Sequence, residues 1–168
     1  MQNLNSAPDL LNLISTFKPE ADLWIFYSAN KESWQKEDII QEFSQNWAHH
    51  GVAIKNVYCV YKEHFLVIVG EKPEGEIGGC GRDGLFQIIK KMDENYKGDL
   101  VPYQNAERNI VHCTRDEFRQ KAATGEIHQQ TIVYNMTQVN VGLLRANFFE
   151  DIALNSWHQK AYRLNPPI

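Results

Sequence analysis

The sequence has few cysteines and no long apolar run, and each shortage excludes a class of protein. Three cysteines in 168 residues, with no CxxC pair, do not form a disulfide framework. The longest strongly apolar run covers residues 65–69, whereas a bilayer span needs roughly 20 residues. Neither a secretion signal nor a lipidation signal is visible. We therefore predict a cytoplasmic protein with reduced thiols and no membrane contact.

The chain also lacks the basic excess that is typical of nucleic-acid-binding proteins. It carries 17 Lys and Arg against 21 Asp and Glu, which gives a formal charge of −4. Its composition is 43% hydrophobic, 11% aromatic and 23% charged, as in folded globular proteins rather than disordered or fibrous ones. We predict a single domain over 1–168 and no nucleic-acid partner.

Hydrophobic periodicity predicts an α+β fold in the ferredoxin-like order βαββαβ. Expected strands are 22–28, 53–61, 65–70 and 109–113, and expected helices are 34–49 and 84–96. Ser33 is expected to cap the first of these helices and Gly51 to stop it. We expect one sheet formed by all four strands, with both helices on one face.

Further elements flank this core, which is expected over 22–113. Residues 1–20 should form an N-terminal helix and arm, with the helix capped by Ser6. Residues 114–168 should add a C-terminal αβα elaboration. Its first helix begins at a capping box formed by Thr114 and Glu117 and ends at Gly125. Strand 131–134 follows, and Leu144, Phe148 and Ile152 suggest one more helix.

Residues Gly79 to Gly84 spell G-x-G-x-x-G before a predicted helix. In a dinucleotide site these glycines bring the pyrophosphate to the helix N-terminus. Here the preceding strand ends near Gly70, too early, and no following strand ends in an acidic residue. The pattern therefore favours a glycine-rich loop that enters a helix, and no cofactor is expected.

Two further motifs are missing. The chain contains no G-x-x-x-x-G-K-[ST], the loop in which backbone amides, a lysine and a hydroxyl hold nucleotide phosphates and magnesium. This excludes a P-loop ATPase. The six histidines show neither HxxxH spacing nor zinc-finger spacing with cysteine, so no metal site is predicted.

Any functional site is expected between Gly75 and Gly84. Cys80 is the candidate catalytic residue, because a helix N-terminus and a nearby guanidinium both favour a thiolate. The candidate ligand-binding residues beside it are Gly79, Gly81, Arg82 and Asp83. A nucleophilic cysteine also needs a base, which His64, His112 or His158 could supply only through the fold. The alternative is that Cys80 packs in the core, as is expected of Cys59 and Cys113.

Several short motifs together resemble a small, uncharacterised bacterial family whose members often carry the label "ABC transporter ATPase". The resemblance covers Leu23 to Tyr162, and Gly81 stands where the family's loop has serine. No established activity comes with it. The motifs that carry it are Trp24-Ile25-Phe26-Tyr27, Asn30-Lys31-Glu32, Trp47, His50-Gly51, Gly79-Cys80 with Asp83, Thr131 to Asn135, and Ser156-Trp157.

Two functions from different classes follow. The first is a non-enzymatic ligand- or protein-binding domain, for which a homodimer through a sheet face is one arrangement. It rests on the ordinary fold pattern, the missing catalytic constellation and the aromatic content. The alternative is a small thiol-dependent enzyme or redox-responsive protein that uses Cys80.

Overall fold

The computed structural model describes all of residues 1–168 as an α+β protein with six α-helices and three sheets of four, four and two strands. The predicted α+β class is confirmed, but the predicted single sheet is wrong. The internal contacts divide the chain into two compact units, Met1–Tyr96 with Gln138–Asn147 and Lys97–Thr137 with Phe148–Ile168. None of the helices combines the length and the apolar character that a membrane crossing requires.

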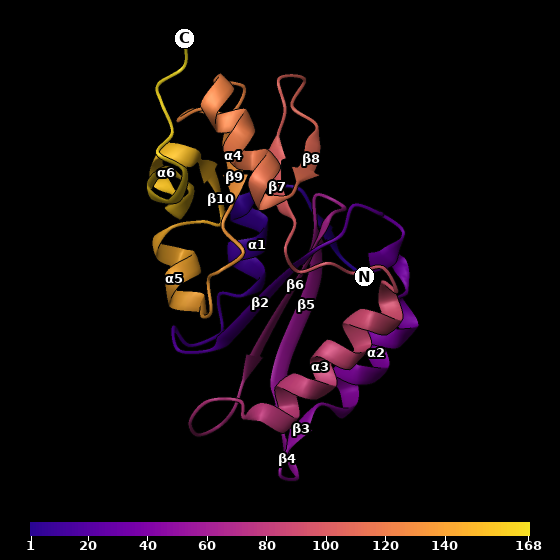
Figure 1. The fold of residues 1–168 in the computed structure, drawn as a ribbon. Helices are drawn as coiled ribbons and strands as arrows, with labels where there is room; N and C mark the ends of the chain where they lie inside the picture. The colour runs from indigo at the N-terminus through magenta and orange to yellow at the C-terminus, as the bar shows by residue number, and fades with distance from the viewer. The chain divides into compact units, whose positions relative to one another are not determined.

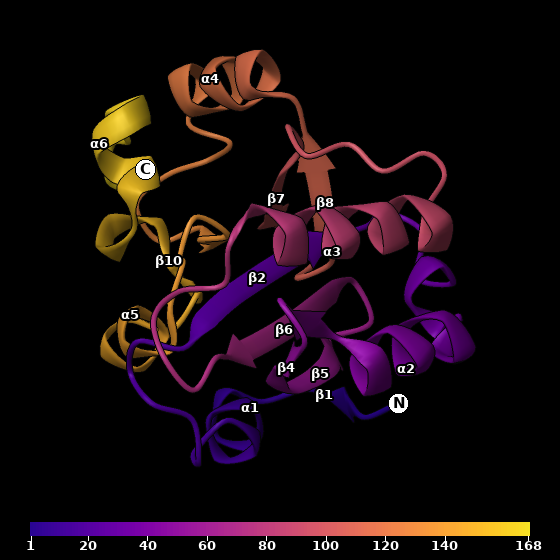
Figure 2. The same ribbon diagram turned by 90° about the horizontal axis from the view of Figure 1, so that it is seen from below.

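The first unit holds a four-stranded sheet with the order β1-β5-β6-β2 and a small two-stranded hairpin. Figures 1 and 2 together label its elements along the chain. They are β1 (Asn3–Leu4), α1 (Ala7–Leu13), β2 (Asp22–Tyr27), α2 (Glu37–Asn46), β3 (Ala48–His49), β4 (Val52–Ala53), β5 (Lys55–Tyr61), β6 (Phe65–Glu71), α3 (Gly79–Met92) and α5 (Val141–Ala146).

The sheet contains a split βαβ unit, because β6 lies between β2 and β5. It is antiparallel to both, while β1 adds to the outer edge of β5 in parallel. A three-residue turn joins β5 to β6, and its residues Lys62 and Glu63 have φ of 47° and 62°, in the left-handed region. The hairpin predicted at Lys62 to His64 is therefore confirmed, whereas the strand predicted at 109–113 is not part of this sheet.

Helices cover both faces of this sheet. α2 and α3 lie together on one side, and α1 and α5 lie on the other (Figures 1 and 2). The placement of the two predicted helices on one face is thus confirmed. Their shared core unites Ile40 of α2 and Leu85 of α3 with Leu66 and Ile68 of β6. Alternate β6 residues such as Val67 are buried on the opposite face.

The helix predicted over 34–49 is divided into three pieces. A 3-10 turn at Ser33–Gln35 precedes α2, and β3 and β4 form a hairpin after it. Ser33 does not cap α2, because α2 begins only at Glu37 and Lys36 is its N-cap. The buried Ser33 hydroxyl bonds with the Ser28 hydroxyl, at 3.2 Å. Gly51 does not stop a helix but occupies the hairpin turn with φ of 77°.

The second unit holds the other four-stranded sheet, with the order β10-β9-β7-β8. Its elements are β7 (Val101–Gln104), β8 (Ile110–Cys113), α4 (Arg115–Thr124), β9 (Ile132–Tyr134), β10 (Glu150–Ile152), a 3-10 turn (Ala153–Asn155) and α6 (Trp157–Tyr162). The predicted strand 109–113 pairs here with β7, a strand that the sequence analysis missed.

In this part of the chain the predicted helix caps agree with the structure better than the predicted strand pairing does. The Thr114 capping box is present, and Gly125 ends α4 with φ of 80°. Phe118 of α4 packs against Val133 and Tyr103 in the core of the unit. The single helix expected from Leu144 to Ile152 is wrong, because only Leu144 is helical and Ile152 lies in β10.

Candidate functional site

The glycine motif is helical, not a loop. α3 begins at Gly79, with Gly78 as its N-cap, so that Gly79 to Gly84 form its first turns. The helix predicted from the sequence over 84–96 began at Gly84 instead. The difference changes the geometry of the candidate site, because side chains on a helix diverge by about 100° per residue.

Close packing explains two of the glycines around this helix start. A Cβ on Gly78 would lie 2.6 Å from Cε1 of His49, and a Cβ on Gly81 would lie 2.7 Å from Cγ2 of Ile77. Trp47 Nε1 also donates to the Gly81 carbonyl, at 3.1 Å. The β3–β4 hairpin therefore packs directly on the backbone of α3.

The helix separates Cys80 from Arg82. Residues two apart on a helix point to nearly opposite sides, and here they line different cavities. The cluster expected from the sequence is therefore divided. Asp83 is exposed and lines neither cavity, and Gly79 is exposed with open space around it.

Cys80 lines a cavity of about 500 Å³ between α2 and α3, which we call the α2–α3 groove. α2 and the residues after it contribute Ile39, Phe43 and Trp47, and α3 contributes Ile88 beside Cys80. Gly81 and Gly84 also line it, so that no side chain from these two positions fills the space. Polar side chains border the groove, namely Glu42, Asn46 and Lys91.

The cysteines differ sharply in their surroundings. Cys80 is exposed and takes part in no hydrogen bond or ion pair, whereas Cys59 and Cys113 are buried. Burial raises the pKa of Cys59 to about 12 and that of Cys113 to about 11. The prediction that Cys59 and Cys113 are core residues is confirmed, and the alternative of a buried Cys80 is wrong.

Arg82 lines a second cavity, of about 700 Å³, which we call the Asp22 cavity. The start of β2, the end of β6 and residues 139–140 also line it. Arg82 Nη2 lies 4.0 Å from Asp22 Oδ1, and the other carboxylate oxygen of Asp22 accepts from the Ile77 backbone N–H, at 3.0 Å.

His49 is a histidine at this end of α3 that the sequence analysis did not assign to the site. Its ring contacts the Gly78 position, and its Nδ1 is buried without a hydrogen-bond partner. Partial desolvation, then the neighbouring His50 and Lys72, lower the pKa of His49. His49 is therefore suited to pack as a neutral ring against the positive end of the helix.

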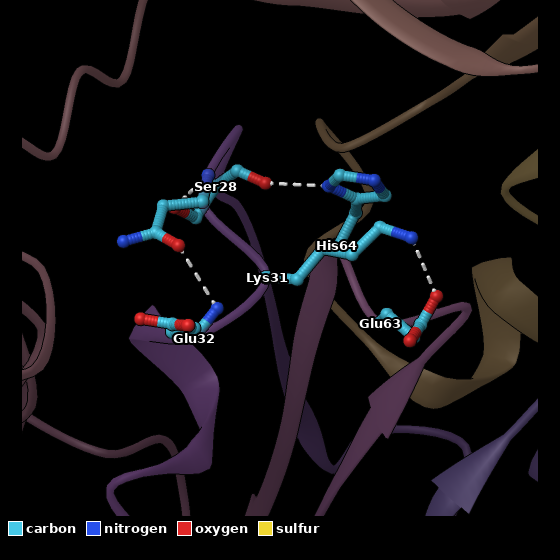
Figure 3. A network of polar contacts seen from close by, with 6 residues as sticks. Ser28, Lys31, Glu32, Glu63 and His64 are labelled. Carbon is cyan, nitrogen blue, oxygen red and sulfur yellow. Dashed lines mark hydrogen bonds and ion pairs between the residues drawn. The ribbon is translucent and has the colours of Figure 1, made fainter.

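His64, one of the bases considered for Cys80, lies elsewhere. Its Nδ1 donates to the Ser28 carbonyl, at 2.8 Å, in the polar network of Figure 3. A carbonyl only accepts, which fixes the proton on Nδ1. The Ser28 hydroxyl bonds to Asp93, just after the C-terminal end of α3, at 2.6 Å. The network therefore joins the β5–β6 turn to the end of α3 that is remote from Cys80.

The same network holds the turn in its left-handed conformation. Trp34 Nε1 donates to the His64 carbonyl, at 2.8 Å. Lys31 pairs with Glu63, at 2.8 Å (Figure 3). Lys31 and Glu63 are half exposed, so this pair stabilises the fold little. We interpret His64 as a structural residue, because it lines neither the α2–α3 groove nor the Asp22 cavity.

No family model, curated protein or solved structure matches the chain, so comparison with known proteins identifies no family for it. The structure also places no group of three or more His, Cys, Asp or Glu side chains where they could hold a metal ion.

Proposed function

We propose that this protein is a non-enzymatic binding domain whose ligand places an apolar or aromatic group in the α2–α3 groove. One observation carries the proposal: Phe43 and Trp47 line a groove of about 500 Å³ that Gly81 and Gly84 leave open. Concave sites with aromatic walls and a few polar groups at the border are typical of small-molecule binding.

The test uses a residue that can close the groove. A Cβ on Gly84 would lie 3.6 Å from Phe43 Cε2, an ordinary contact, so Gly84→Leu extends a side chain into the groove. Gly79→Leu is the matched control, because nothing lies within 4 Å of its Cβ position and it does not line the groove. Fluorescence titration with the apolar dye anilinonaphthalene sulfonate measures the affinity of each variant.

We expect Gly84→Leu to weaken dye binding at least tenfold and Gly79→Leu to leave it unchanged, with unaltered circular dichroism for both. Bound dye should also slow alkylation of Cys80, because the thiol shares the groove. Equal binding by the two variants would show that the groove is not the site.

A second candidate function, thiol chemistry at Cys80, is favoured by the exposure of this cysteine alone among the three. It is placed second because the thiol forms no hydrogen bond with a histidine or carboxylate that could act as its base. Turnover of a thiol-specific substrate that Cys80→Ser abolishes would reverse this order.

We also infer that the first unit is a variant of the ferredoxin-like arrangement. Its β2, β6 and β5 have the expected neighbours, and β2 bonds on its outer side to Val139, through Leu23 N–H at 3.0 Å. Membership of the bacterial family labelled "ABC transporter ATPase" stays a prediction.

A further inference from the structure

The Asp22 cavity is a second concave site, independent of the α2–α3 groove. Three segments are held around it by hydrogen bonds. The Lys18 backbone N–H donates to Glu71 at 2.8 Å, the Ile77 N–H donates to Asp22, and the Val141 N–H donates to the Ala21 carbonyl at 3.0 Å. These bonds fix the positions of the segments that form its walls.

The charges of the cavity nearly balance. Lys18, Lys72, Glu20 and Glu76 line it, and none of these four side chains forms a hydrogen bond or ion pair. Glu71 is already bound to a backbone amide. A polyanion such as a nucleotide would meet several carboxylates here, so the balance favours a ligand with no net charge.

Asp22 and Arg82 form the one incomplete pair in the cavity. Their nearest charged atoms lie 4.0 Å apart, too far for a hydrogen bond. The Asp22 side chain is 15% exposed and the Arg82 side chain 44% exposed, so both reach solvent. Oδ1 of Asp22 can still accept a hydrogen bond, and the Arg82 guanidinium can still donate several.

We propose that this pair binds a free α-amino acid. The ammonium of the amino acid donates to Asp22 Oδ1, and its carboxylate accepts from the Arg82 guanidinium. Both ligand groups are attached to one carbon, so they can reach two protein groups that are 4.0 Å apart. Ala21, Pro73 and Val139 supply apolar surface in the same cavity for the ligand side chain.

The test is isothermal titration calorimetry of the full chain with each standard L-amino acid. For any amino acid that binds, its N-acetyl derivative, which lacks the ammonium, and its carboxamide, which lacks the carboxylate, are titrated next. We expect each derivative to bind at least tenfold more weakly. Asp22→Asn should remove the discrimination against the N-acetyl form, and Arg82→Gln the discrimination against the carboxamide.

Lys90→Gln is the control, because this exposed lysine lies on the same helix but lines neither cavity. It should bind as the unmodified protein does, and circular dichroism should show that all variants fold. The proposal is overturned if no amino acid gives saturable heat at millimolar concentration, or if a binding amino acid and its two derivatives bind equally.

Discussion

At the scale of single residues, burial decides what each titratable group can do. Cys59 lies in β5 among apolar side chains, and its thiol stays protonated far above neutral pH. His158 is 1% exposed and packs between Trp157 and Phe118. Desolvation lowers the pKa of His158 from 6.5 to about 4, so it is neutral in the folded protein.

The cysteines should therefore differ in reactivity. In the native protein we expect iodoacetamide to modify Cys80 alone, because burial holds Cys59 and Cys113 as inaccessible thiols. Peptide mass spectrometry after a timed reaction at neutral pH measures this, with urea-unfolded protein as the control for full modification. Native modification of Cys113 at the rate of Cys80 would contradict it.

A related prediction concerns Arg82, which the sequence placed beside the thiol. Because the helix directs Arg82 into the other cavity, Arg82→Ala should leave the alkylation rate of Cys80 unchanged. Alkylation with iodoacetamide, quenched at a series of times, compares the unmodified protein with Arg82→Ala. Clearly slower alkylation of Cys80 in the variant would mean that Arg82 and Cys80 act together.

His158 should make stability depend on pH. The unfolded chain takes up the proton near pH 6.5 and the folded chain only near 4, so the stabilisation is complete above 6.5 and is lost as pH falls towards 4. The loss from this residue is about 3 kcal/mol, at 1.36 kcal/mol per unit of pKa difference.

Urea unfolding of the unmodified protein and His158→Gln at pH 7 and pH 4 measures this effect. The variant should lose about 3 kcal/mol less on acidification. Parallel pH profiles for the unmodified protein and His158→Gln would show that another group is responsible.

At the scale of elements, the start of α3 shows how one motif can hold glycines for different reasons. Gly81 is required because the Trp47 indole and the Ile77 side chain lie against the helix backbone. Gly84 has room for a methyl group, and the lack of a side chain at this position keeps the α2–α3 groove open. The G-x-G-x-x-G spacing thus arises from packing and from the shape of the groove.

These two glycines should respond in opposite directions to alanine. Gly84→Ala should stabilise the protein by about 0.5–1 kcal/mol through helix propensity. Gly81→Ala should destabilise it by about 1–3 kcal/mol, because a methyl group would overlap buried Ile77. Thermal unfolding of the unmodified protein and the two variants measures these changes in stability. Stabilisation by both would mean that the hairpin moves away from α3 at little cost.

At the scale of the whole molecule, the glycine motif at the start of α3 differs from a phosphate-binding loop. At the start of α3, His49 covers Gly78, and Ile77 and Trp47 cover Gly81. The first turn of the helix carries Arg82 but no lysine. The residues at the start of this helix therefore do not support the label "ABC transporter ATPase" that the resemblance carries.

Purified protein should consequently neither hydrolyse ATP nor bind it tightly. Calorimetric titration with Mg-ATP is expected to give no saturable heat up to millimolar nucleotide, with an established P-loop ATPase as the positive control. A dissociation constant in the low micromolar range, about −8 kcal/mol, would contradict this expectation and support the label.

Sequence periodicity predicted most elements of the first unit, because each depends on residues close in the chain. β2 and the β5–β6 hairpin follow apolar runs, and the Ser6 cap of α1 is present with Asp9 N–H donating to it. The break at Lys36 was not predicted: Ser33 lies in a separate 3-10 turn, and its hydroxyl bonds with Ser28, a partner outside both helices.

The sequence by itself therefore determined the α+β class, the β5–β6 turn, the caps at Ser6 and Thr114, and the existence of a cysteine near the start of a helix. Only the tertiary structure decided that strand 110–113 pairs with β7 and that Cys80 and Arg82 face different cavities. The physical reason is that caps and turns are set by neighbouring residues, whereas strand pairing and cavity walls depend on contacts between distant ones. The start of α3 at Gly79, five residues before the predicted start, was enough to divide the predicted site.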